Sequence, residues 1–175
     1  MKDLEEKLGA FRVGIVSKTN PKTGEVRVVF DDLDGLETDE LPVLYPKTLK
    51  DRYYAMPDVG EHVACLMDEH FETGVVLGAV YDETNLPPES SQDKDYIRWE
   101  NGTVIEHDRS TGRITIDTPG QVIIRAAGVT IDAPVTVLDD VTVQGGDVVA
   151  DRISLKTHIH GKVTSGDGKS GQPEG

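Results

Sequence analysis

Cysteine, aromatic residues and long apolar runs are all scarce in this chain of 175 residues. Cys65 is the only cysteine, so no disulfide can form within the chain and nothing points to an oxidising compartment. Because Cys65 lies in an apolar run, we expect a buried thiol rather than a nucleophile. Aromatic residues make up 5% of the chain and hydrophobic residues 37%, which is little for one large core. This composition favours a small domain joined to something elongated.

No apolar run approaches the ~18 residues that a membrane span requires, and residues 1–8 are charged rather than apolar. We therefore expect no signal peptide, and synthesis in a cytoplasm. Basic residues are also scarce, since 18 Lys and Arg against 32 Asp and Glu give a formal charge of −14. This argues against nucleic acid or an anionic membrane as an electrostatically held partner. Residues 152–175 differ, because four basic and two acidic residues make that end +2 and leave −16 for the rest.

Residues 10–85 predict a compact β domain. Segments rich in alternating or continuous apolar residues are separated by turn-forming Asn, Pro, Gly and Asp. An OB-fold barrel often binds nucleic acid through exposed aromatic residues in a basic groove, but the loop at 31–40 is strongly acidic instead. We therefore expect an OB-fold barrel with no nucleic-acid partner. Its five strands are predicted at 11–17, 25–30, 40–45, 61–67 and 74–81.

Two segments flank the predicted barrel. Residues 1–9 are expected to form an N-terminal extension. Residues 86–98 are expected to be a linker, because they are polar and begin with a stiffening Pro87-Pro88 pair.

Residues 99–155 consist of short apolar segments separated by Gly, Asp or Pro, with period-2 alternation inside most segments. Each segment can bury only about two side chains, so it needs neighbouring strands on every side. A solenoid made by one chain, at ~20 residues a coil, would have fewer than three coils. We therefore favour an intertwined trimeric β-helix, or β-prism, with Val and Ile in a narrow core. Its first inward residues are expected at 114, 122, 129, 135, 141, 148 and 153, at steps of 5 to 8 residues.

His158 and His160 follow this array, in residues 156–175, which we expect to form an apex. In an extended strand, side chains at i and i+2 point to the same side. One chain offers a metal only two imidazoles, whereas three chains on a threefold axis would offer six. Six imidazole nitrogens suit an octahedral transition-metal ion rather than tetrahedral zinc, although this chemistry leaves the metal itself open. The alternative is that the pair is ordinary polar surface, which is also our expectation for His62, for His70 and for His107 in a turn.

Three features together resemble a known family. They are the segments 56–63 and 73–81 of the predicted barrel, the array of short strands, and His158-Ile159-His160 followed by a Gly- and Ser-rich tail. This combination resembles the central spike, or baseplate assembly protein V, of contractile-tailed phages. Related spikes occur in phage-tail-like bacteriocins and in type VI secretion.

The resemblance implies a structural protein of the virion, not an enzyme, located at the tip of the tail baseplate and assembled in the host cytoplasm. It implies an OB-fold base that docks on the baseplate hub and tail tube proteins, and a homotrimeric spike that pierces the host outer membrane when the tail contracts. It further implies that His158 and His160 of three chains bind one iron ion. In some relatives calcium and chloride ions also lie inside the trimer, but no motif here can be matched to those sites.

Two other functions remain open at this point. A receptor-binding fibre tip, or adhesin, would need exposed aromatic or sugar-binding residues at the distal end, and residues 156–175 contain no Phe, Tyr or Trp. A hexapeptide-type acyltransferase is also a trimeric β-helix, but it would need a regular six-residue repeat. The steps in this array vary from 5 to 8 residues.

Overall fold

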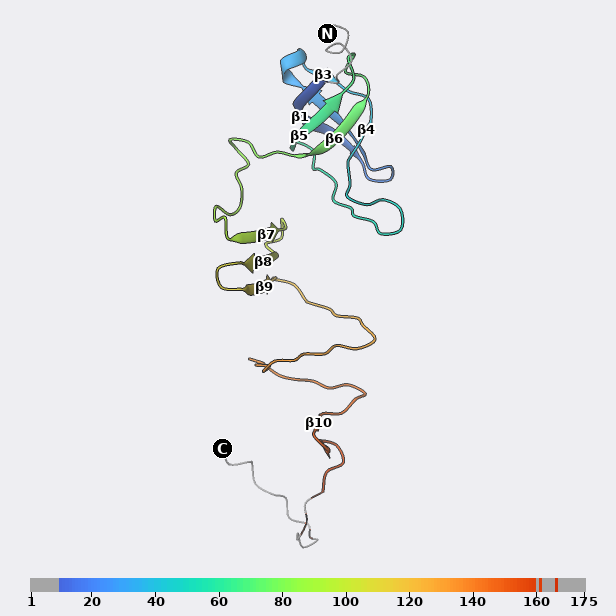
Figure 1. Cartoon of the computed structure of the whole chain (residues 1–175). Helices are drawn as coiled ribbons and strands as arrows, with labels where there is room; N and C mark the ends of the chain where they lie inside the picture. Colours follow the sequence, from blue (N-terminus) through green and yellow to red (C-terminus); the bar gives the residue numbers. More distant parts are fainter. Residues whose placement is uncertain (1–9, 160, 162–165, 167–175) are drawn as a thin grey trace. The chain divides into compact units, whose positions relative to one another are not determined.

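The computed structural model describes residues 10–159, 161 and 166. The chain divides into two units, which meet between residues 122 and 123. The described residues form β-strands and one 3-10 turn, η1 (Asp31–Leu33), with no α-helix among them (Figure 1). The expectation of an all-β protein is confirmed. In the part of the chain that the structure describes, no helix is long and apolar enough to span a membrane.

Six strands between residues 10 and 79 form one sheet in the order β3-β2-β1-β5-β6, with β4 also paired to β2. The sheet closes on itself, because Val43, just after β4, forms a parallel bridge with Val76 of β6. The backbone N–H of Leu44 donates to the Val76 carbonyl at 2.8 Å beside this bridge. The strands are β1 (Ala10–Asn20), β2 (Glu25–Phe30), β3 (Leu36–Glu37), β4 (Leu41–Pro42), β5 (His62–Met67) and β6 (Gly74–Ala79).

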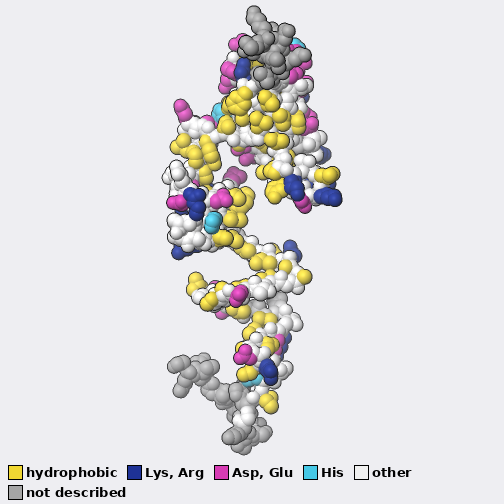
Figure 2. Space-filling model, in the orientation of Figure 1, with side chains coloured by type: hydrophobic (Ala, Val, Ile, Leu, Met, Phe, Trp, Pro, Cys, Tyr) yellow, Lys and Arg dark blue, Asp and Glu magenta, His cyan; other side chains and the backbone are white. Residues whose placement is uncertain are grey.

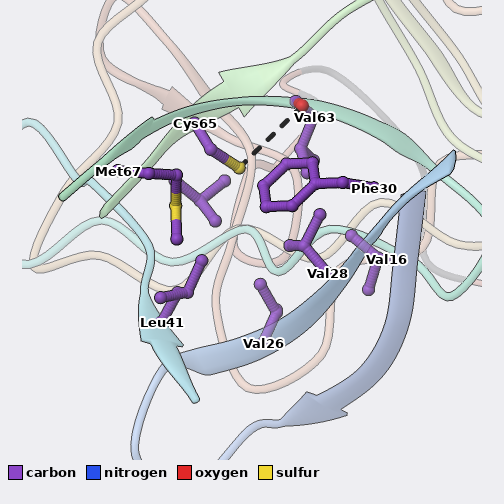
Figure 3. Close-up of a cluster of buried hydrophobic side chains, with 9 residues drawn as sticks. Val16, Val26, Val28, Phe30, Leu41, Val63, Cys65 and Met67 are labelled. Atoms are coloured by element: carbon purple, nitrogen blue, oxygen red, sulfur yellow. Dashed lines mark hydrogen bonds between the residues drawn. The ribbon is translucent and has the colours of Figure 1, made fainter. Parts of the chain in front are cut away.

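The closed sheet encloses the hydrophobic core of the first unit (Figure 3). Alternate residues of β2 point inward, as the period of a half-buried strand requires. Cys65 is fully buried, as predicted, and this burial raises the pKa of its thiol to about 11. The core contains Val16, Val26, Val28, Phe30, Leu41, Val63, Cys65, Met67 and Val76.

A separate three-stranded antiparallel sheet follows in the same unit (Figure 1). It consists of β7 (Lys94–Arg98), β8 (Val104–Asp108) and β9 (Arg113–Asp117). The expected linker 86–98 is therefore wrong at its end, where β7 begins. The polar residues of β7 look like linker in the sequence, but Lys94 has partners across the sheet. Its Nζ donates to Glu106 Oε2 at 2.9 Å and lies 3.3 Å from Glu89 Oε2.

The second unit contains one two-stranded hairpin, β10 (Val149–Ala150) with β11 (Ile153–Ser154). Among the described residues, no backbone hydrogen bond joins any part of 121–146 to another backbone group. All residues from 123 to 153 are exposed, and hydrophobic side chains are visible along this segment (Figure 2). The exposed fractions of Val129, Val135 and Val141, three of the residues predicted to face inward, are 64%, 63% and 67%.

Candidate metal centre

The β10–β11 hairpin positions His158, the first of the two predicted metal ligands. The turn between the strands contains Asp151 in the left-handed conformation, with φ 53°. After β11 the chain turns back, so that the His158 N–H donates to the Ser154 carbonyl at 3.0 Å. The location of His158 is therefore fixed by backbone contacts to the hairpin.

Asp147 organises the base of this hairpin. One carboxylate oxygen accepts hydrogen bonds from the backbone N–H groups of Val148 at 2.8 Å and Lys156 at 3.1 Å. The other accepts a hydrogen bond from the Ser154 hydroxyl. These bonds, first of all the one from Ser154, lower the pKa of Asp147, and the nearby His158 lowers it further. Sequence reasoning missed Asp147. The only signal was its place directly after Gly145-Gly146.

The contacts of the His158 ring indicate which nitrogen carries hydrogen. Nδ1 lies 3.1 Å from the carbonyl oxygens of both Ser154 and Leu155. A carbonyl oxygen can only accept, so Nδ1 must be the donor. A neutral imidazole then has its lone pair on Nε2. Metal-binding histidines commonly show this arrangement, in which the second nitrogen is oriented by a backbone carbonyl. His158 therefore fits the role of a metal ligand.

His160 lies outside the described residues, so its geometry relative to His158 stays a prediction. Within the described part of the chain, no group of three or more His, Cys, Asp or Glu side chains is arranged to hold a metal ion. His158 is the one described histidine at this hairpin, and a single imidazole is too few for a closed metal site. Any metal centre at His158 needs donors from beyond the described part of a single chain.

The other described histidines belong to the first unit. His62 begins β5, where its Nδ1 lies 2.7 Å from Asp82 Oδ2. Hydrogen bonds from Asn85 and Thr84 hold the pKa of Asp82 well below its usual value. His70 is exposed beside Glu69. His107 lies within β8, so its prediction as a turn residue is wrong.

Two comparisons with known proteins bear on this site. Residues 152–174, which include β11 and His158, match the family described as the GpV Apex motif. Together with the similarity described next, this match confirms the resemblance to phage baseplate spike proteins. The relative is the Spike protein of Escherichia phage P2, which is 32% identical over 126 residues. The alignment covers 71% of this chain and 56% of the phage protein, so the chain spans little more than half the length of that relative.

Proposed function

We propose that three copies of this chain form the central spike of a contractile phage baseplate, which pierces the host outer membrane when the tail contracts. The similarity to a phage spike protein supports the location at the baseplate of the virion. The observation that carries the trimer is the exposure of the apolar array in a single chain.

The array contains the Val and Ile side chains that are typical of a hydrophobic core, but in the single chain these side chains are exposed. Residues 123–153 are exposed throughout, although their Val and Ile alternate with polar residues as in a half-buried strand. Burying one such side chain contributes about 1.5–3 kcal/mol, and the array repeats them along its whole length. Its backbone groups also need partners. Three chains around one axis would supply both, as a β-prism with no free strand edge.

The closed sheet at residues 10–79 would be the base of the spike. Its strand pairing and its closure through Val43 and Val76 support an OB-fold assignment for residues 10–85. This base would bind the baseplate hub and tail tube proteins. Because the chain carries a net charge of −14, anionic lipid would repel it, so penetration would depend on the force of sheath contraction.

The apex would hold one iron ion on His158 and His160 of three chains. The matched GpV Apex motif, residues 152–174, contains both histidines, and the Nδ1 contacts of His158 place the acceptor nitrogen of a neutral ring at Nε2. Iron bound there would link the three chain ends, because metal binding stabilises the fold that presents its ligands. The hairpin, held by Asp147, would keep each His158 ring in the orientation that binding requires.

The test combines mass and metal content of the purified full chain. We expect light scattering to give three times the chain mass of 19.1 kDa, and elemental analysis to give one iron per three chains. The double variant His158→Ala/His160→Ala should lose the iron. His70→Ala, which removes an exposed histidine elsewhere, should keep it. A mass of one chain would contradict the trimer, and equal iron in both variants would contradict the apex site.

A further inference from the structure

The outer surface of the closed sheet has an apolar face over β1, β5 and β6. Phe11 of β1 pairs with Leu66 of β5, and Leu66 pairs with Val75 of β6, so these three outward residues form a row across the sheet. An antiparallel sheet that faces water on one side usually carries polar residues there. Here the outward residues of the three strands are Phe11, Val13, Ile15, Ala64, Leu66, Val75 and Leu77, with no charged side chain among them. We call these seven residues the outer apolar face.

The outer apolar face is open to solvent in the single chain. The exposed fractions of Phe11, Leu66 and Leu77 are 58%, 45% and 41%, and hydrophobic side chains gather over β5 and β6 in Figure 2. The outer side of β2, by contrast, carries Glu25 and Arg27. A contiguous exposed apolar surface usually marks a site where another molecule binds.

A basic loop, residues 44–57, adjoins the outer apolar face. It carries Lys47, Lys50 and Arg52 against a single acidic residue, Asp51, whereas the whole chain has a net charge of −14. Lys47 is paired with Asp51, but Lys50 and Arg52 form no ion pair with any described residue. The charges of Lys50 and Arg52 are therefore available to acidic groups of another molecule.

Aromatic residues order the basic loop beside β6. Tyr45 and Tyr54 stack with their ring centroids 6.2 Å apart. Both tyrosines line one pocket together with Gly78 and Ala79, at the end of β6. The loop thus lies next to the strand that carries Leu77, so one partner can contact the loop and the outer apolar face at the same time.

The charges indicate what kind of molecule fits this surface. The basic loop favours an acidic partner, and the outer apolar face requires apolar side chains opposite it. The acidic loop 31–40 of a second copy fits poorly, because the Arg27 guanidinium of its own chain already lies 3.7 Å from a Glu37 carboxylate oxygen and 3.8 Å from one of Asp39. Nucleic acid would contact the basic loop but leave the apolar face uncovered.

We infer that the outer apolar face and the basic loop together form the surface by which this chain docks on a different tail protein, whose facing surface is apolar with Asp and Glu at its border. The inference rests on the proposed function, in which the base binds hub and tail tube proteins, and it assigns that contact to defined residues. The apolar side chains supply most of the binding free energy. Lys50 and Arg52 set the orientation of the partner.

Incorporation of the full chain into tails provides the test. A phage that encodes this chain, with a stop codon in the spike gene, is supplied with the chain in trans, and the copies per purified tail are counted by mass spectrometry. Leu66→Asp places a charge on the outer apolar face and should reduce incorporation about tenfold or more. Leu36→Asp is the matched control, because Leu36 is 41% exposed on β3, outside the face, and it should be incorporated like the unaltered chain.

A second pair of variants tests the charges without altering the apolar face. Lys50→Glu/Arg52→Glu should reduce incorporation about tenfold, because the new carboxylates repel an acidic partner. Lys18→Glu/Lys22→Glu makes the same change of charge at the β1–β2 hairpin and should leave incorporation unchanged. Each variant should keep the solution mass of the unaltered chain, and if Leu66→Asp does not, the variant of the basic loop decides.

Carbodiimide cross-linking in purified tails identifies the partner. We expect Lys50 to be joined to a carboxylate of a different tail protein. Cross-links of Lys50 only to carboxylates of this chain, in the same or another copy, would overturn the inference, as would binding of labelled single-stranded DNA that Lys50→Glu/Arg52→Glu abolishes. Equal incorporation of all variants would also overturn it and leave the proposed function standing, whereas absence of the unaltered chain from tails would overturn both.

Discussion

A carboxylate oxygen of Asp147 accepts a hydrogen bond from the backbone N–H of Lys156 at 3.1 Å. This bond joins a residue two positions before β10 to Lys156, the first residue of the expected apex segment 156–175. The same carboxylate binds Ser154, whose carbonyl contacts Nδ1 of His158. The orientation of a proposed metal ligand thus depends on an acidic residue eleven positions earlier in the sequence.

Replacing Asp147 should loosen the segment that leads to His158. In Asp147→Ala the N–H groups of Val148 and Lys156 lose their acceptor, so their amide hydrogen exchange should become about tenfold faster. Exchange measured by NMR or mass spectrometry checks this. Asp132→Ala, which removes the same charge from the same unit, should leave both amides unchanged. Unchanged exchange in Asp147→Ala would show that the hairpin does not depend on this carboxylate.

The turn between β8 and β9 should respond to acid. Hydrogen bonds to Asp108, first of all from the Ser110 hydroxyl, lower the pKa of its carboxyl from 3.8 to about 2. A carboxyl whose pKa is lower in the folded state stabilises that state at higher pH, and the contribution falls as pH drops from about 4 to about 2. NMR signals of Ser110 and Thr111 should therefore shift in that interval. In Asp108→Asn the shift should disappear, whereas Asp117→Asn, at the end of β9, should retain it.

The free energy of unfolding should depend on the hydroxyl of Thr38, although Thr38 is a small residue. Its side chain is buried, with Oγ1 accepting from the Val28 N–H at 3.1 Å and donating to the Asp39 carbonyl at 2.7 Å. Thr38→Val keeps the shape but leaves the Val28 N–H unpaired, which costs about 1–3 kcal/mol of unfolding free energy. Urea denaturation measures this cost. Thr38→Ser keeps the hydroxyl and should lose less, and a larger loss in Thr38→Ser would assign the effect to packing.

The core of the closed sheet should depend on Phe30 far more than on Phe11. Phe30 is fully buried and Phe11, on β1, is 58% exposed. Phe30→Ala should lower the free energy of unfolding by about 3–5 kcal/mol, whereas Phe11→Ala should change it by less than about 1 kcal/mol. The same urea experiment compares them. Similar losses in both variants would mean that the β1 surface is covered in the folded protein.

The longer strands of the closed sheet could be predicted because each carries its own pattern of apolar residues. Glu25–Phe30 alternates buried and half-buried residues, and the segment at 62–67 is apolar enough to be central. Strand β3 was missed because Leu36–Glu37 is two residues long and lies in an acidic loop. Strand β7 was missed because Lys94 is polar in the sequence, and only the sheet reveals its contact with Glu106.

The array and the candidate site show a second limit of prediction from the sequence. The alternation of Val and Ile in 121–155 predicts that one face is covered, but periodicity within one chain does not identify the molecule that covers it. Similarly, His158 could be singled out from its spacing to His160, whereas the role of Asp147 depends on hydrogen bonds that only the folded hairpin creates.

The backbone of residues 121–146 makes no hydrogen bond to other described backbone groups, and this has a kinetic consequence. The closed sheet contains all its pairing partners, so it can form at a rate independent of dilution. In the proposed trimer the array would acquire its partners by collision, so its ordering should slow as the protein is diluted. Maturation would then proceed in two stages: the closed sheet of each chain would fold first, and the arrays of three chains would become ordered together in a second, slower step.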